Sequence, residues 1–143
     1  MDVKYADLLA DNGGLLTEDM LPGFTPKAFK KRVETHILSG QVDLEEFITA
    51  ELTGQDFRRI QQAIHYYVYT QVYRDCARRT TGQPLVGQDT DIRVEHDPEA
   101  TKKFYATADE CWQTHKLLLA GDVQTSEITK AYPGPELTRI GYE

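Results

Sequence analysis

The residues of this chain best suited to chemistry are carboxylates gathered in one short stretch, namely Asp89, Asp91, Glu95 and Asp97. Clustered carboxylate oxygens are the ligands that hard cations such as Ca²⁺ and Mg²⁺ prefer. The spacing is not that of an EF-hand, because no glycine stands at the sharp-turn position and no acid closes the loop. We therefore expect solvated charges here and no metal site.

The histidines and motifs give no catalytic set either. The sequence has no Gly-rich phosphate loop, GxSxG elbow, HExxH or zinc-deaminase signature. The four histidines are scattered, and none has a sequence neighbour that would make a nucleophile and base pair; they are His36, His65, His96 and His115. His115 falls on an apolar helix face, which favours a hydrogen-bonded core residue over a ligand. These patterns predict a protein that is not an enzyme and has no cofactor.

The two cysteines, Cys76 and Cys111, lie far apart, each inside an expected helix and outside any CxxC or Cys/His ligand spacing. We interpret them as reduced core residues. The chain of 143 residues is 40% hydrophobic, which fits one domain, and its net charge of -7 disfavours a protein whose main task is to neutralise phosphate. No apolar run approaches the length of a membrane span, and residues 1–14 lack signal-peptide features, so we expect no membrane contact and a cytoplasmic chain.

The elements that must position these residues begin with residues 1–24, which mix short apolar pairs with glycine and predict a peripheral arm. Thr25 and Pro26 predict a helix start, and the helix is expected to run to about Ser39, with Gly40 ending it. A basic cluster on this helix either contacts a nucleic acid or acidic partner, or is a solvated face; it comprises Lys27, Lys30, Lys31 and Arg32.

Two further helices are expected before the middle of the chain. Asp43 and Glu46 form a capping box that predicts a short helix ending at Thr53 and Gly54. A long central helix then runs from about Gln55 to Arg79. Its core-facing stripe repeats at spacings of three and four and comprises Phe57, Ile60, Ile64, Val68 and Val72.

A second stripe on the central helix consists of Tyr66, Tyr69 and Tyr73, projecting from roughly the opposite side. A surface helix of a monomer is polar on that side, so something is expected to cover these rings. Two alternatives stay open. Other segments of the same domain pack there and accept hydrogen bonds from the phenols, or the tyrosines form a subunit interface, where aromatic residues are enriched.

The segment at about 82–96 predicts a small projecting hairpin, because the β-prone pieces Leu85-Val86 and Ile92-Val94 flank a turn. Asp97 and Pro98 then predict the start of a last helix that ends near Ala120. Its expected buried face comprises Ala100, Phe104, Ala108, Cys111, His115 and Leu118, flanked by Trp112 and Leu119.

Residues 122–143 carry separated apolar anchors between prolines and glycines, namely Ile128, Tyr132, Ile140 and Tyr142. Such a segment cannot make its own core. It predicts an extended C-terminal tail that lies along its own domain or a neighbouring subunit, or else simple disorder. The fold class expected is mainly α: a small helical bundle over residues 25–121, with a short projecting β-hairpin and the extended tail.

The run AIHYYVYTQVYRD from Ala63 to Asp75, followed by TTGQPLVGQDTDI and then DPEATKKFYATADECWQTHKLLL from Asp97 to Leu119, resembles the adaptor or head-completion proteins of tailed-bacteriophage necks. The resemblance covers about Phe57 to Leu119 and rests on a Tyr-rich helix leading through a hairpin into another helix. It implies a structural virion protein, located in the neck and in the host cytoplasm during assembly.

The resemblance further implies a homo-oligomeric ring, dodecameric in that family, which joins the portal protein to tail or other neck proteins. Genomic DNA would pass through the lumen without sequence-specific contact, and an acidic chain suits a passage that must not grip phosphates. The subunit interface would use the second aromatic stripe, the hairpin and the tail. Its residues would be Tyr66, Tyr69, Tyr73, Leu85, Val86, Ile92, Val94, Ile128, Tyr132, Ile140 and Tyr142.

An alternative from another class is a small helical regulator or interaction module. It would hold nucleic acid or an acidic partner with the basic helix from Lys27 to Arg32 and the arginines near Arg78. A metal-dependent enzyme that uses Asp89, Asp91 and Glu95 is a third possibility.

Overall fold

The computed structural model describes residues 3–10, 15–45, 54–82 and 96–120, and these residues contain four helices and no strand. The helices are α1 (Tyr5–Ala10), α2 (Pro26–Asp43), α3 (Gly54–Thr80) and α4 (Pro98–Leu119). The mainly-α class expected from the sequence is therefore confirmed. The expected hairpin at about 82–96 and the tail at 122–143 fall on segments outside the described residues.

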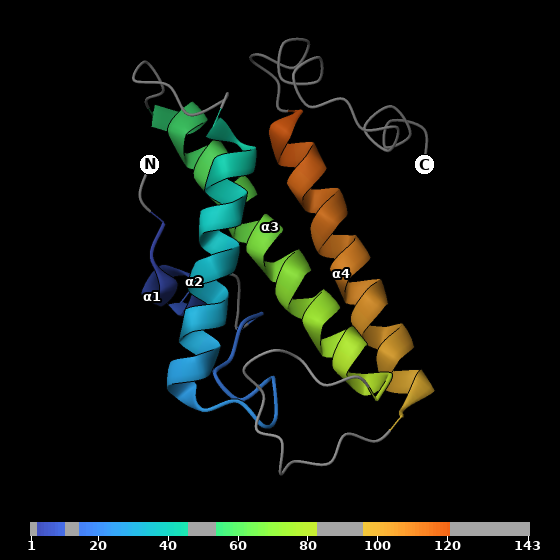
Figure 1. Ribbon diagram of the computed structural model, residues 1–143. Coiled ribbons are helices and arrows are strands. Elements are labelled where there is room, and N and C mark those ends of the chain that lie inside the picture. Colours follow the sequence, from blue (N-terminus) through green and yellow to red (C-terminus); the bar gives the residue numbers. More distant parts are fainter. Residues whose placement is uncertain (1–2, 11–14, 46–53, 83–95, 121–143) are drawn as a thin grey trace, which may run out of the picture.

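Helix α3 is the centre of the arrangement (Figure 1). It lies between α2 and α4, runs antiparallel to both, and packs most extensively against α4. The short helix α1 lies beside α2. The core is formed where these helices meet, and its α3 members include the predicted Ile60, Ile64, Val68 and Val72. The predicted Phe57 is only half-buried and is not part of this core.

Two predicted helix starts are confirmed by their capping geometry. The Thr25 hydroxyl accepts from the Ala28 amide at 3.1 Å, and the Asp97 carboxylate accepts from the Ala100 amide at 3.1 Å. In each helix proline occupies the first turn, where its missing N–H leaves no hydrogen bond unmade. These ends follow from local chemistry, which is why the sequence located them.

The predicted end of the first long helix is wrong. Helix α2 continues through Gly40 to Asp43, so Gly40 does not end the helix and Asp43 does not begin another. Gly40 is buried, and a Cβ built on it would lie only 2.8 Å from Tyr67 Cδ1 of α3. Glycine is needed there because the Tyr67 ring packs against the backbone of α2. The rest of the expected short helix, residues 46–53, lies outside the described residues.

The description of residues 1–24 as a peripheral arm also requires correction. Leu8, Leu16 and Leu21 are fully or almost fully buried and belong to the same core as α2 and α3. The segment contains little regular secondary structure, but these three leucine side chains pack into the core. Residues 3–24 therefore form part of the domain wherever the structure describes them.

The ends of α3 and α4 are fastened together. At one end the Asp97 amide donates to the Thr80 carbonyl at 2.8 Å, and the Thr80 and Thr101 hydroxyls lie 2.7 Å apart. At the other end Arg59 donates to the Leu118 carbonyl at 2.6 Å, which satisfies a carbonyl at the C-terminus of α4. These contacts hold the C-terminal end of α3 beside the start of α4, and the C-terminal end of α4 beside the start of α3.

Candidate functional site

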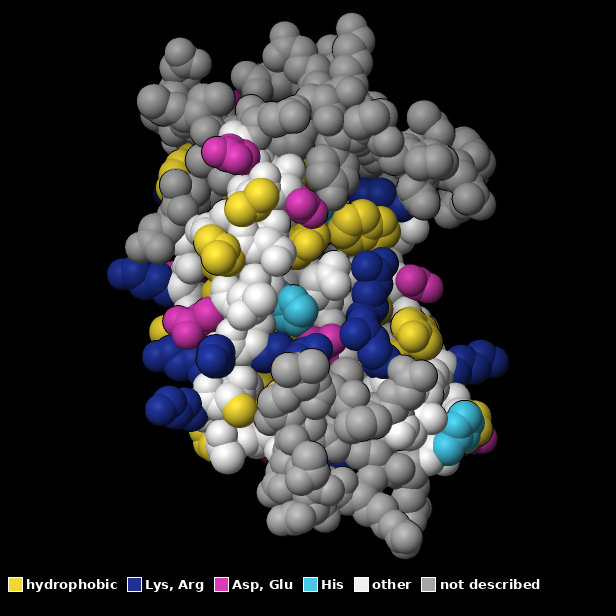
Figure 2. All heavy atoms as spheres, in the orientation of Figure 1, with side chains coloured by type: hydrophobic (Ala, Val, Ile, Leu, Met, Phe, Trp, Pro, Cys, Tyr) yellow, Lys and Arg dark blue, Asp and Glu magenta, His cyan; other side chains and the backbone are white. Residues whose placement is uncertain are grey.

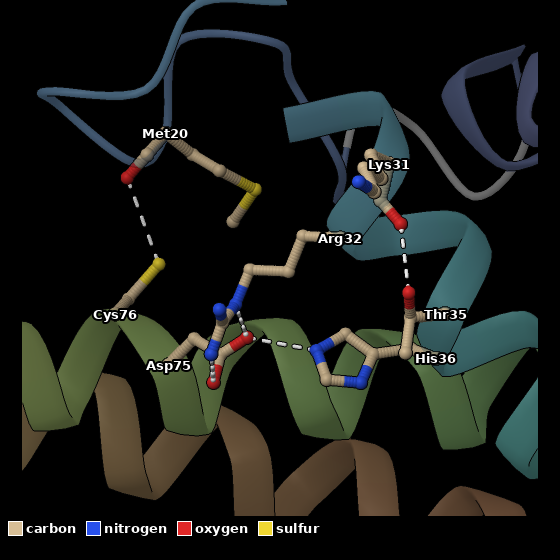
Figure 3. Close-up of polar contacts among 7 residues, drawn as sticks. All are labelled: Met20, Lys31, Arg32, Thr35, His36, Asp75 and Cys76. Atoms are coloured by element: carbon tan, nitrogen blue, oxygen red, sulfur yellow. Dashed lines mark hydrogen bonds and ion pairs between the residues drawn. The ribbon is translucent and has the colours of Figure 1, made fainter. Parts of the chain in front are cut away.

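The most concentrated polar group in the described part of the chain is an ion cluster between α2 and α3 (Figure 3). The Asp75 side chain is only 3% exposed and accepts from Arg32 at two points, with Nε to Oδ2 at 2.7 Å and Nη2 to Oδ1 at 3.0 Å. His36 Nε2 lies 2.8 Å from the same Oδ2. Arg32 and His36 are one helical turn apart, so α2 presents both to one carboxylate.

The electrostatics of this cluster favour the ionised carboxylate. Burial by itself raises the pKa of Asp75, but the hydrogen bonds and charges of His36 and Arg32 outweigh it and hold that pKa below its ordinary value. A buried charge is stable only when it is paired and hydrogen-bonded. Asp75 meets both conditions, so the cluster joins α2 to α3 at neutral pH.

An aspartate and histidine pair invites comparison with a catalytic dyad, but its described neighbours supply no available nucleophile. The Thr35 hydroxyl donates to the Lys31 carbonyl at 3.0 Å, and the Cys76 thiol points to the Met20 carbonyl at 3.6 Å (Figure 3). Burial raises the pKa of Cys76 to about 12, so it is not a thiolate at neutral pH. The geometry is that of a clamp between helices.

A second concentration of functional groups is aromatic and lies where α3 meets α4. Trp112 stacks on His115 with centroids 4.7 Å apart, and Tyr67 lies 5.8 Å from His115. The Arg74 guanidinium sits 5.5 Å from the centre of the Trp112 ring, within cation–π range. Tyr67 also lines a hollow of about 390 Å³ beside α2, so part of this aromatic group reaches the surface.

His115 is the core histidine that the sequence predicts. It is fully buried, and its Nδ1 lies 2.6 Å from the Ala63 carbonyl. Burial lowers the pKa of His115 to about 4. The hydrogen bond to the Ala63 carbonyl raises this pKa, but by less than burial lowers it. The ring is therefore neutral at physiological pH. The expected buried face of α4 is confirmed at Ala108, Cys111 and His115, and the flanking Leu119 is buried as well. The other expected members are only half-buried, namely Ala100, Phe104 and Leu118. The sequence missed Lys116, which is 1% exposed.

The tyrosine stripe of α3 is covered by the chain itself. Tyr69 is fully buried, and its hydroxyl donates to the Leu8 carbonyl at 3.4 Å. The Tyr73 hydroxyl donates to the Leu15 carbonyl at 2.7 Å. Tyr66 is half-buried and meets Tyr69 edge to face, with ring centres 5.3 Å apart. Of the two alternatives, this geometry favours packing within one domain, because Tyr69 has no surface left to offer a subunit.

The remaining interface residues expected from the sequence cannot be placed, because they lie outside the described residues. They are Leu85, Val86, Ile92, Val94, Ile128, Tyr132, Ile140 and Tyr142. The same holds for the carboxylates Asp89, Asp91 and Glu95. Asp97 is described, and its carboxylate serves as the cap of α4. Among the described residues no group of three or more His, Cys, Asp or Glu side chains is arranged to hold a metal ion.

The basic residues singled out in the sequence divide into two groups. Arg32 is bound to Asp75, and Arg79 donates to the Pro22 carbonyl at 2.9 Å, so both hold the domain together. The exposed ones are Lys27, Lys30, Lys31 and Arg78. The cysteines agree with their interpretation as core residues, since Cys76 and Cys111 are both buried and not joined in a disulfide.

Sequence reasoning missed the ion cluster as a unit. Its partners are 39 and 43 residues apart along the chain, so no local motif announces them. The available signal was a lone carboxylate, Asp75, three residues after the buried Val72, together with an Arg and a His one turn apart on another amphipathic helix. A charge so close to a buried stripe requires partners.

Within the described residues, no helix is long and apolar enough to cross a bilayer. The chain matches no protein-family model, no curated protein and no solved structure.

Proposed function

We propose that the chain is a structural subunit of a tailed-phage neck, which forms a ring between the portal and the tail around the DNA passage. The observation that carries the proposal is the closely packed pair of long helices α3 and α4. Both long helices are fixed at their two ends, by Thr80 with Asp97 and Thr101, and by Arg59 with Leu118. In this proposal the residues that connect the two helices, 83–95, contact the neighbouring protein.

The internal chemistry of the domain supports an assembly role. The ion cluster of Arg32, His36 and Asp75 is used to join two helices, and the two cysteines are buried. The regulator alternative loses Arg32 and Arg79, which serve contacts within the chain, and keeps the exposed Lys27, Lys31 and Arg78. The proposed subunit therefore binds through segments that leave the helical domain, with Leu85, Val86, Ile92 and Val94 as the first residues to test.

The experiment is co-sedimentation of the full chain with purified portal rings from the same genome. We expect the chain to sediment with the rings, and Leu85→Asp combined with Ile92→Asp to reduce the bound amount at least tenfold. Tyr105→Asp is the matched control, because Tyr105 is 44% exposed on α4 and takes no part in the proposed contact. A chain that stays in the supernatant with portal rings, or that sediments only with duplex DNA in low salt, would overturn the proposal.

A further inference from the structure

The outer side of α2 carries a continuous exposed stripe. Its members recur at spacings of three and four, which places the four that lie within α2 on one helix face. They are Lys31, Thr35, Leu38, Val42 and Glu45, the last just past the helix end, and all five are exposed. Leu38 is 62% exposed and Val42 is 60% exposed. The two largest apolar side chains of this face thus stand in solvent at its centre.

The surface beside this stripe is hollowed on both sides. A hollow of about 520 Å³ lies between the stripe and the start of the chain, lined by Tyr5, Ile37 and Leu38 among others. A second hollow of about 390 Å³ lies between the stripe and α3, lined by Leu38, Val42 and Tyr67 among others. An apolar ridge flanked by two hollows is the surface relief with which one helix packs into another, ridge into groove.

The charges of α2 oppose its own dipole. A helix favours acidic residues at its start and basic residues at its end. Helix α2 has no acidic residue in its first turn and no basic residue in its last, but has Lys27 near its start and Asp43 at its end. Figure 2 shows dark blue side chains over the N-terminal half of α2, hydrophobic ones farther along and an acidic one near its far end. An antiparallel copy of α2 would bring basic residues in the N-terminal half of one helix toward acidic residues near the C-terminal end of the other.

We propose that the free chain pairs with a second copy of itself through this stripe, with the two α2 helices antiparallel and a two-fold axis beside Leu38. Lys31 and Glu45 each lie seven residues from Leu38, on opposite sides. The two-fold arrangement therefore sets Lys31 of each copy opposite Glu45 of the other, while Leu38 meets its symmetry mate. Each Val42 packs into the hollowed surface beside the stripe of the other copy.

This pair is distinct from the ring of the proposed function and does not depend on it. A two-fold contact closes after two copies and cannot by itself generate a ring. Helix α2 is about 27 Å long at 1.5 Å per residue, so the contact is small and belongs with the weak class that buries less than about 1,200 Å² in total. The pairing is therefore expected to depend on concentration.

The first test is oxidative cross-linking of Leu38→Cys in the full chain. Because Leu38 lies beside the axis, two copies should join through this position, and the native cysteines should not interfere since both are buried. Leu117→Cys is the matched control, being 53% exposed on α4 and outside the stripe. We expect at least fivefold more cross-linked dimer from Leu38→Cys. Equal yields from the two variants would show random collision and would overturn the proposal.

The second test reverses the charges. In the Leu38→Cys background, Lys31→Glu alone and Glu45→Lys alone should each lower the cross-linking yield several-fold, while the two together should restore it. Circular dichroism should show an intact helical fold in every variant, because all three positions are exposed. Cross-linking yields that the charge reversals leave unchanged, or that are not restored in the combined variant, would exclude this antiparallel arrangement.

The mass of the wild-type chain, measured by light scattering, should rise with concentration toward that of two chains. A mass of one chain at every concentration would overturn the pairing.

Discussion

Replacing Asp75 with asparagine tests how α2 is held on the domain. The change keeps the shape of the side chain but removes the charge that accepts from Arg32 at 2.7 and 3.0 Å and meets His36 at 2.8 Å. Arg32 and His36 would then face a neutral amide whose NH2 group cannot accept a hydrogen bond. The cluster would lose its attraction and part of its hydrogen bonding together.

The magnitude follows from how buried each partner is. Removing one partner of a buried ion pair costs about 3–5 kcal/mol. Asp75 is 3% exposed, but Arg32 and His36 are 19% and 17% exposed and can recover some hydration. We therefore expect Asp75→Asn to lower the free energy of unfolding by about 2–3 kcal/mol. With an unfolding entropy of about 2.1 cal/mol/K per residue, this corresponds to a fall in Tm of roughly 8 °C.

The assay is thermal unfolding followed by circular dichroism at pH 7, with Asp109→Asn as control because Asp109 is an exposed carboxylate on α4. Arg32→Met, measured in both backgrounds, should cost much less once Asp75 is already asparagine. The Asp75 contribution should also depend on pH. The folded-state pKa lies below the ordinary 3.8, so the stabilisation is present above that pH and is lost as pH falls through the folded pKa. A Tm within 2 °C of the wild type for Asp75→Asn would refute the clamp.

Three further predictions concern single contacts. Gly40→Ala should destabilise the protein by about 1–2 kcal/mol in chemical denaturation, because the added Cβ would lie 2.8 Å from Tyr67. The same change should stabilise a Tyr67→Ala variant, where only the higher helix propensity of alanine remains. A loss of stability of the same size in both backgrounds would contradict this. Tyr73→Phe should cost about 1 kcal/mol by deleting the bond to the Leu15 carbonyl, and unchanged stability would mean that water replaces it. His115 has a pKa of about 4 in the folded protein against 6.5 ordinarily. Its contribution to the free energy of unfolding, up to about 3 kcal/mol, should therefore be complete above pH 6.5 and should decline as pH falls toward 4. His115→Gln should flatten this decline in stability, and an unchanged dependence of stability on pH would count against a buried neutral His115.

Features set by neighbouring residues were predictable from the sequence. The caps at Thr25 and Asp97 depend on contacts within one turn, and the core stripe of α3 is marked by the spacing of its own apolar residues. His115 was also predicted, because an apolar helix face leaves a histidine few environments other than the core. In each case either the hydrogen-bond partner lies on the same helix, or the whole helix face is apolar.

Features set by distant residues were not predictable in the same way. Gly40 has the local signature of a helix end, but the approach of Tyr67 from α3 gives it another use inside α2. Leu8 and Leu16 look isolated in sequence, but both are buried in the common core. Their segment lies against α3, where Tyr69 and Tyr73 donate to the Leu8 and Leu15 carbonyls. The partners of Asp75 lie on another helix, and their positions along the chain do not reveal the cluster.

Electron microscopy tests most directly whether this chain is an assembly subunit. The measurement is negative-stain electron microscopy of purified portal rings from the same genome, before and after addition of the full chain. The account predicts an added ring of density on the face of the portal that joins the tail, absent with Leu85→Asp combined with Ile92→Asp. Portal rings unchanged by a saturating excess of the folded wild-type chain would contradict it.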